Sequence, residues 1–295
     1  MGYLFLSIAL FAGVTKGYCG KKTSSYTTGF RDAILANTLR MLICIVIGFI
    51  LILPQGGISM LKPTKDLILI SALSGISTSV FVVTWLVSVR KSAFMMVDIF
   101  LIFGTLIPII LSNVMYGEKI RLTQYIGIGI LFIAVILMCS YNNALKGKIT
   151  LPAFLLLILC GTASGFADFS QKLLIKTLGN GSVSAFNFYT YVFATVTLII
   201  AFFLARNDGK ATDIKNLGKM SIYILIMAIC LFVNSYFKTL AASSLSSVIL
   251  YPLNQGMSLV LSSAMAAIVF KERLTLKAII GIFTAFAGLL IINLL

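Results

Sequence analysis

Residues 116–132, YGEKIRLTQYIGIGILF, and residues 270–286, FKERLTLKAIIGIFTAF, repeat one pattern. At a constant offset of 154 positions, the identical pairs are Glu118/Glu272, Leu122/Leu276, Ile126/Ile280, Gly127/Gly281, Ile128/Ile282 and Phe132/Phe286. In both copies a long apolar run is followed by a short charged turn and then by another apolar run. A match at one fixed offset predicts a duplicated unit of about half the chain.

The composition indicates an integral membrane protein. Of the 295 residues, 60% are hydrophobic and 11% are charged, and the mean hydropathy is +1.08. A soluble domain so apolar could hardly cover its surface with polar groups. Apolar runs long enough to cross a hydrocarbon core of about 30 Å recur along the whole chain, and no stretch is left for a sizeable soluble domain.

Ten transmembrane helices are predicted, five on each side of a polar link, NNALKGK. They cover approximately residues 2–19, 30–53, 66–88, 93–116, 122–141, 151–176, 182–204, 219–242, 245–270 and 276–295. The two repeats are expected to cover 1–143 and 150–295. Because a unit of five spans is odd, the second copy must enter the membrane the other way up. The predicted fold is an all-α integral membrane protein made of two inverted five-helix repeats.

The placement of the charges argues against nucleic-acid binding, and the residue composition argues against metal binding and enzymatic activity. The net charge of +15 comes from Lys and Arg residues that punctuate the apolar runs, as they do where they anchor the ends of membrane helices. There is no histidine, which removes the commonest metal ligand and the commonest general base. The five cysteines show no framework spacing and are expected to be free thiols. We therefore expect no cofactor and no metal.

The Lys and Arg residues also predict an orientation. The face opposite the termini collects more of them than the face that holds the termini. Under the positive-inside rule, this pattern places both termini outside the cell. Alternatively, some of these charges line a cavity and say nothing about orientation.

The five-plus-five plan, with the motifs GEKIRLTQYIGI and KERLTLKAIIGI, resembles the drug/metabolite transporter superfamily of the EamA type. In that family a Glu-basic turn opens the last helix of each half, and Arg40 resembles the family's arginine in the second span. The resemblance implies secondary transport of a small metabolite by alternating access. It implies a central cavity between the first, third, fourth, sixth, eighth and ninth spans, with the fifth and tenth packed together at one edge. It also implies cytoplasmic termini, which opposes the charge count, so the orientation stays open.

Charged residues inside the apolar spans are the first candidates for the site, since each costs about 2.5–3.5 kcal/mol to insert. Lys16 and Asp98 lie near helix ends at one face and are predicted to pair. Asp168 and Lys238 approach the opposite face and are predicted to form a second pair. Such pairs would act as gates, or a carboxylate would take up a coupling proton. The alternative is that each lysine snorkels to the headgroups; Arg40 has no predicted partner and is expected to pack or to contact headgroups.

Trp85, Tyr251 and Asn254 are expected to add aromatic and hydrogen-bonding groups to the same cavity, the alternative being that they only join helices. Pro252 and Pro108 are expected to weaken their spans, as happens near transporter binding sites. Gly127 and Gly281, with Gly129 and Gly288 nearby, are expected to allow close approach of the fifth and tenth spans. Glu118 and Glu272 are expected to cap the helices that follow them.

The leading hypothesis is a secondary active transporter in the cytoplasmic membrane. Its partners would be the lipid bilayer, a small polar or amphipathic metabolite such as an amino acid, and protons as a coupling ion. The alternatives are a flippase for a lipid-linked substrate or a membrane scaffold that does not transport. An intramembrane enzyme is disfavoured, since the chain has no histidine, no Gly-x-Ser-x-Gly motif and no two-aspartate protease pattern.

Overall fold

The computed structural model describes residues 1–27, 29–91, 94–145, 150–205, 214–271 and 275–294, and over these residues it contains helices and no strand. The α-helices are α1 (Gly2–Ser24), α2 (Phe30–Ile52), α3 (Lys65–Lys91), α4 (Phe94–Gly104), α5 (Leu106–Tyr116), α6 (Leu122–Leu145), α7 (Leu151–Leu178), α8 (Val183–Leu204), α9 (Ile214–Ala241), α10 (Ser247–Ile268) and α11 (Leu276–Leu294). Short 3₁₀ turns lie at Leu53–Gln55, Gly57–Leu61 and Asn180–Ser182.

Local sequence decides where several helices begin and end. At the start of α2, the Asp32 carboxylate accepts a hydrogen bond from the Gly29 N–H at 3.2 Å, which satisfies a backbone donor that the first turn leaves open. Pro152 lies in the first turn of α7, where its missing N–H costs nothing. Helix α5 ends at Gly117, whose φ of 63° is left-handed, a conformation that glycine adopts without strain.

The fourth predicted span is broken into two helices, α4 and α5, at Thr105. Pro108 lies four residues after Gly104, so its ring opposes the Gly104 carbonyl and it has no N–H to donate. The sequence predicts that Pro108 weakens this span, and the structure shows that the helix is interrupted there. Pro252 does not have this effect, because α10 stays helical from one side of it to the other.

Six helices in the described part of the chain are long and apolar enough to cross a membrane. They cover Gly2–Ser24, Phe30–Gln55, Lys65–Arg90, Leu151–Leu178, Asn180–Leu204 and Met220–Ala241. Shorter apolar helices cover Phe100–Tyr116, Leu122–Ala134 and Ile279–Ile292. The chain is thus an all-helical membrane protein with several apolar spans.

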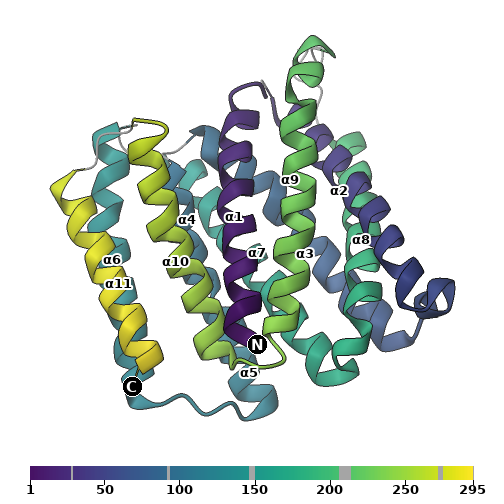
Figure 1. Ribbon diagram of the computed structural model, residues 1–295. Helices are drawn as coiled ribbons and strands as arrows, with labels where there is room; N and C mark the ends of the chain where they lie inside the picture. The colour runs from purple at the N-terminus through teal and green to yellow at the C-terminus, as the bar shows by residue number, and fades with distance from the viewer. Residues whose placement is uncertain (28, 92–93, 146–149, 206–213, 272–274, 295) are drawn as a thin grey trace.

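The helices pack as a flattened bundle whose centre is formed by α1, α3, α4, α7, α9 and α10 (Figure 1). The pair α6 and α11 closes one edge, and the pair α2 and α8 closes the other. In the centre, α1 packs on α9, and α7 packs on both α3 and α4. Both termini lie at the same end of the bundle (Figure 1), which we call the terminal face.

Glycines let two pairs of helices approach at backbone distance. On α6 and α11, a Cβ at Gly127 would lie 2.8 Å from the carbonyl oxygen of Gly288, which confirms the predicted close packing. Gly129 is different, since a Cβ there would meet nothing within 4 Å. On α4 and α7, a Cβ at Gly104 would overlap the carbonyl of Gly161, a crossing that sequence analysis did not identify.

Replacing Gly127 by alanine is expected to lower the apparent melting temperature in detergent by several degrees. The new methyl group would lie 2.6 Å from Ile292 Cγ1 as well as against Gly288, and overpacking of this kind costs about 1–3 kcal/mol. Gly129→Ala, two residues along the same helix, is the matched control and is expected to melt no lower than wild type. Equal melting temperatures for the two variants would contradict the packing.

Candidate functional site

A cavity of about 90 Å³ lies in the centre of the bundle. Its lining comes from α1, α3, α4, α7, α9 and α10, joined by Tyr191 of α8, and these six helices correspond to the spans that the family resemblance places around a cavity. The polar lining residues include Lys16, Thr78, Ser164, Asp168, Gln171, Asn234, Ser235, Lys238, Asn254, Gln255, Ser258 and Ser262. The apolar lining includes Leu10, Phe81, Trp85, Leu101, Leu231 and Met265.

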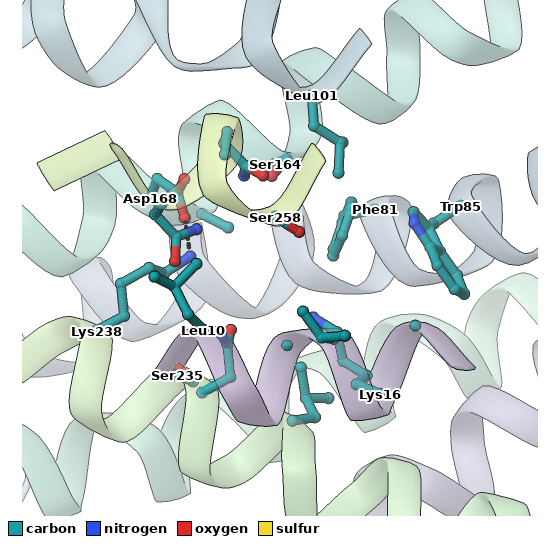
Figure 2. Close-up of a pocket in the computed structure, with 18 of the residues that line it drawn as sticks. Leu10, Lys16, Phe81, Trp85, Leu101, Ser164, Asp168, Ser235, Lys238 and Ser258 are labelled. Carbon is teal, nitrogen blue, oxygen red and sulfur yellow. Dashed lines mark hydrogen bonds and ion pairs between the residues drawn. The ribbon is translucent and has the colours of Figure 1, made fainter. Parts of the chain in front are cut away.

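Asp168 and Lys238 form an ion pair at one end of this cavity (Figure 2). The Lys238 Nζ lies 2.5 Å from the Asp168 Oδ1, and the two side chains are 9% and 3% exposed respectively. The pair predicted from the sequence is therefore present, and Lys238 does not snorkel. Both residues lie in the last turns of helices that end at the terminal face, so this is the terminal-face end of the cavity.

The other end of the cavity is aromatic and holds Lys16 and Trp85 (Figure 2). The Lys16 Nζ lies 5.8 Å from the centroid of the Phe81 ring. Trp85 is buried, and its ring occupies the space that any Cβ on Gly20 would need. Asp98, the predicted partner of Lys16, has a side chain that lies outside the described residues, so this second pair stays a prediction.

Two side-chain amides bring unpaired polar atoms to the cavity wall. The Gln171 Oε1 and the Asn254 Oδ1 are buried and accept no hydrogen bond from the described residues. Sequence analysis proposed Asn254 but missed Gln171, although its position one turn after Asp168 puts both on one face of α7. Since buried polar groups need partners, these oxygens are available to the donors of a bound molecule.

Tyr251 is not among the residues that line the cavity, although sequence analysis proposed it. The side chain is fully buried, and its hydroxyl donates to the backbone carbonyl of Asp168 at 2.7 Å. Tyr251 therefore joins α10 to α7 and supports the turn that carries the ion pair. Asn234 does line the cavity, but its amide donates to the Ala9 carbonyl at 2.7 Å and also joins α9 to α1.

Glu118 does not cap the helix that follows it, so the expectation for this residue is wrong. One carboxylate oxygen accepts a hydrogen bond from the Ser247 N–H at 2.8 Å, which caps α10 instead, and the other lies 2.8 Å from the Lys172 Nζ. Helix α6 begins with a different cap, in which Gln124 Oε1 accepts from the Arg121 N–H at 3.0 Å. Glu272 lies outside the described residues, so its expected cap stays a prediction.

The contacts of Glu118 change its acidity. Burial raises the pKa of this carboxyl group, but the hydrogen bonds from Lys172 and Ser247 outweigh it, so the pKa is lowered from its ordinary value. Glu118 therefore carries its negative charge at neutral pH and holds both partners.

Arg40 does not contact the headgroups, which corrects one of the two expectations for it. Its side chain is 2% exposed, and its Nε has no hydrogen-bond partner among the described residues. It belongs to α2, which packs on α8 and α9 away from the cavity. The packing explanation is the one that holds.

Comparisons with known proteins agree with this architecture. Residues 151–294 match the profile of the EamA-like transporter family. A solved crystal structure superposes on the chain with a TM-score of 0.74 and 14% sequence identity, covering 99% of this chain and 96% of the other. At that identity the likeness shows the fold alone. No curated protein sequence matches the chain.

Breaking the Asp168–Lys238 pair on one side only is expected to destabilise the protein more than removing it. Asp168→Asn or Lys238→Met leaves a buried charge without its partner, a loss that costs about 3–5 kcal/mol, whereas neutral replacement of both partners is often tolerated. We expect the double variant to melt above both single variants in detergent. Additive losses in the double variant would contradict the coupling.

The stabilising effect of Glu118 is expected to disappear in acid. A carboxyl group whose pKa is lowered by folding contributes stability above its unfolded pKa, and this stability is lost as the pH falls through the folded value. Wild type is therefore expected to melt above Glu118→Gln at neutral pH, with the difference narrowing as the pH falls below the ordinary value of 4.5. Other acidic groups titrate in both proteins and cancel in the comparison. A difference that does not change with pH would contradict the assignment.

Proposed function

We propose that the chain, whose residues 151–294 match the EamA-like transporter family, is a secondary active transporter of the cytoplasmic membrane. It would move a small amphipathic, amino-acid-like metabolite by alternating access, through ten spans arranged as two inverted halves. The observation that carries the proposal is the central cavity, which holds a buried ion pair and unpaired amides between helices from both halves.

The helix packing supports two halves related by a two-fold axis. Exchanging each helix with its counterpart in the other half turns the pair α1–α9 into α7–α3, and both pairs are in contact. The pairs α2–α8 and α6–α11 each join counterparts and are unchanged by the exchange. Successive spans alternate in direction along the chain (Figure 1), so counterparts five spans apart run in opposite directions.

One contact even occurs twice at the same offset as the sequence repeat. The Lys176 Nζ lies 5.7 Å from the centroid of the Tyr116 ring. The Lys22 Nζ lies 5.8 Å from the centroid of the Phe270 ring. Lys176 follows Lys22 by 154 positions, and Phe270 follows Tyr116 by 154 positions. This repeated contact at equivalent positions supports the proposed duplication.

The chemistry of the cavity favours an amphipathic substrate. At the terminal-face end, Asp168, Gln171 and Asn254 offer acceptors for an ammonium group. At the other end, Trp85 and its neighbours present apolar and aromatic surface next to the positive charge of Lys16. Aromatic faces bind both apolar groups and cations. A bare anion or a plain sugar would use only part of this surface, so an amino acid with an apolar side chain is the best match.

The size of the cavity indicates that the described conformation is contracted. The cavity volume of about 90 Å³ is below the range of about 300–1,000 Å³ that ligand pockets usually measure. A metabolite therefore enters only if the helices separate on one side. Such separation on alternate sides is the movement that alternating access requires.

Purified protein in liposomes is expected to take up one or more amino acids with apolar side chains from a panel of labelled metabolites. Measuring uptake with and without a pH gradient tests proton coupling, and Asp168→Asn is expected to lose most of the uptake, because it removes the only acidic group among the described lining residues. Gly129→Ala, which touches nothing in the described structure, serves as the matched control and is expected to retain it. Thermal stabilisation by lipids alone, with no uptake of any soluble metabolite, would contradict the proposal.

A further inference from the structure

Three separate segments are tied together at the terminal face by Glu118 and Lys172. Glu118 lies in the turn between α5 and α6, Lys172 lies on α7, and Ser247 is the first residue of α10. Besides the two bonds of Glu118 to these partners, the Ser247 hydroxyl hydrogen-bonds the Ser112 hydroxyl of α5 at 2.8 Å. The first half of the chain is thus fastened to the second half at this face.

Lys172 uses all three of its ammonium donors in this arrangement. Besides the contact with Glu118, its Nζ donates to the carbonyl oxygens of Ala242, at 3.2 Å, and of Leu245, at 2.9 Å. Both carbonyls belong to the turn between α9 and α10. The side chains of Lys172 and Glu118 are 4% and 12% exposed, so these bonds are shielded from water and are stronger than those of a surface ion pair.

This arrangement lies directly between the cavity and the terminal face. Gln171, which lines the cavity, is the residue before Lys172, and Asp168 lies one turn further from the terminal face on the same helix. The turn that Lys172 holds joins α9, which carries Lys238, to α10, which carries Asn254. Helices that must move apart to open the cavity on this side are therefore the helices that these bonds hold together.

We propose that Glu118 and Lys172 form the gate that closes the cavity at the terminal face. They are positioning residues that do not touch the transported molecule. The role of the gate in transport rests on the proposed function, but the closure itself can be measured without a substrate. Opening this side breaks the bonds of Lys172 to Glu118 and to the turn between α9 and α10.

At the far end of the bundle, a different residue stands at the position of Lys172. At the repeat offset, the position of Lys172 is occupied in the first half by Tyr18, whose ring stacks on Phe270 at 5.7 Å between centroids. The Lys21 Nζ lies 4.2 Å from the centroid of the same Phe270 ring. The residue at this position therefore differs between the two ends, and removal of the Glu118–Lys172 contact is expected to release the terminal face alone.

The positions of acid and base in this gate are not interchangeable. The N-terminus of α10 carries partial positive charge and favours a carboxylate, whereas the carbonyl groups after α9 favour a cation. The double variant Glu118→Lys with Lys172→Glu still holds one acid and one base. However, it places a cation at the partly positive N-terminus of α10 and an anion at the partly negative carbonyl groups after α9. We expect the exchanged variant to open as readily as the single variants.

Accessibility of a cysteine in the cavity tests the gate without any substrate. The five native cysteines are replaced by alanine or serine, and Ser164→Cys introduces one thiol on a residue that lines the cavity. A membrane-impermeant maleimide is then added separately to each side of sealed vesicles, and a tag on the N-terminus reports which side is the terminal face. Glu118→Gln and Lys172→Met are each expected to raise the labelling rate from the terminal face about tenfold, which corresponds to about 1.4 kcal/mol.

Three comparisons make the result decisive. Lys176→Met removes the same charge one turn further along α7, where the ammonium lies over Tyr116, and is expected to leave labelling unchanged. The double variant Glu118→Gln with Lys172→Met is expected to raise the labelling rate by less than the product of the two single increases, since the two residues share the Glu118–Lys172 contact. Lys172→Arg keeps the charge and the donors, so it is expected to label more slowly than Lys172→Met.

Unchanged labelling from the terminal face in both Glu118→Gln and Lys172→Met would overturn the gate, provided that both elute as monodisperse proteins. Equal increases from both faces would also overturn it, because they would indicate general loosening of the bundle. Faster labelling from the terminal face alone in both variants, together with no uptake of any metabolite, would support the gate and count against the proposed function.

Discussion

A charged side chain that is buried in a membrane-spanning bundle is costly unless another group of the protein pairs with it. This constraint shapes the structure at two places. Asp168 and Lys238 satisfy each other in the centre of the bundle. Glu118 and Lys172 do so at the terminal face, with backbone groups completing their bonds. In each case the partners come from different segments of the chain, so the cost of leaving a buried charge unpaired favours the packing that brings these segments together.

The same helices also need room to approach, and glycine provides it. The contact of Gly127 with Gly288 lets α6 and α11 form one edge of the bundle. The crossing of α4 and α7 at Gly104 and Gly161 brings two cavity-forming helices to backbone distance. Close backbone packing replaces the hydrophobic driving force that is missing between helices in lipid. Charge pairing therefore favours contact between particular segments, and glycine allows particular helices to approach closely.

Apolar contacts and polar groups are separated within the bundle. The edges, α6 with α11 and α2 with α8, join counterparts of the two halves through apolar contacts. The centre holds the polar groups, the broken helix at Thr105 and the cavity. The proposed transport would use this division, because the edges would hold the molecule together while the central helices part on one side. In the proposed gate, the bonds around Lys172 keep the terminal face shut.

The sequence by itself determined the all-helical membrane fold and the pairing of Asp168 with Lys238, and it predicts the duplication. Each of these depends on a signal that is local or strictly periodic: apolar runs of spanning length, a match at one offset, and charges too costly to bury alone. The inverted arrangement of the two halves remains a proposal, supported by the packing of the counterpart helices.

Only the tertiary structure decided what Glu118, Tyr251 and Gln171 do. Glu118 lies in the turn before α6 yet caps α10. Tyr251 lies one turn from Asn254, yet its hydroxyl binds the Asp168 carbonyl and it is not among the lining residues. Gln171 is identified only by its place in the lining of the cavity, together with Asn254. Sequence spacing fixes the face of a helix on which a side chain lies, but not the rotation of that helix toward its neighbours, since contacts between residues far apart in the sequence set that rotation.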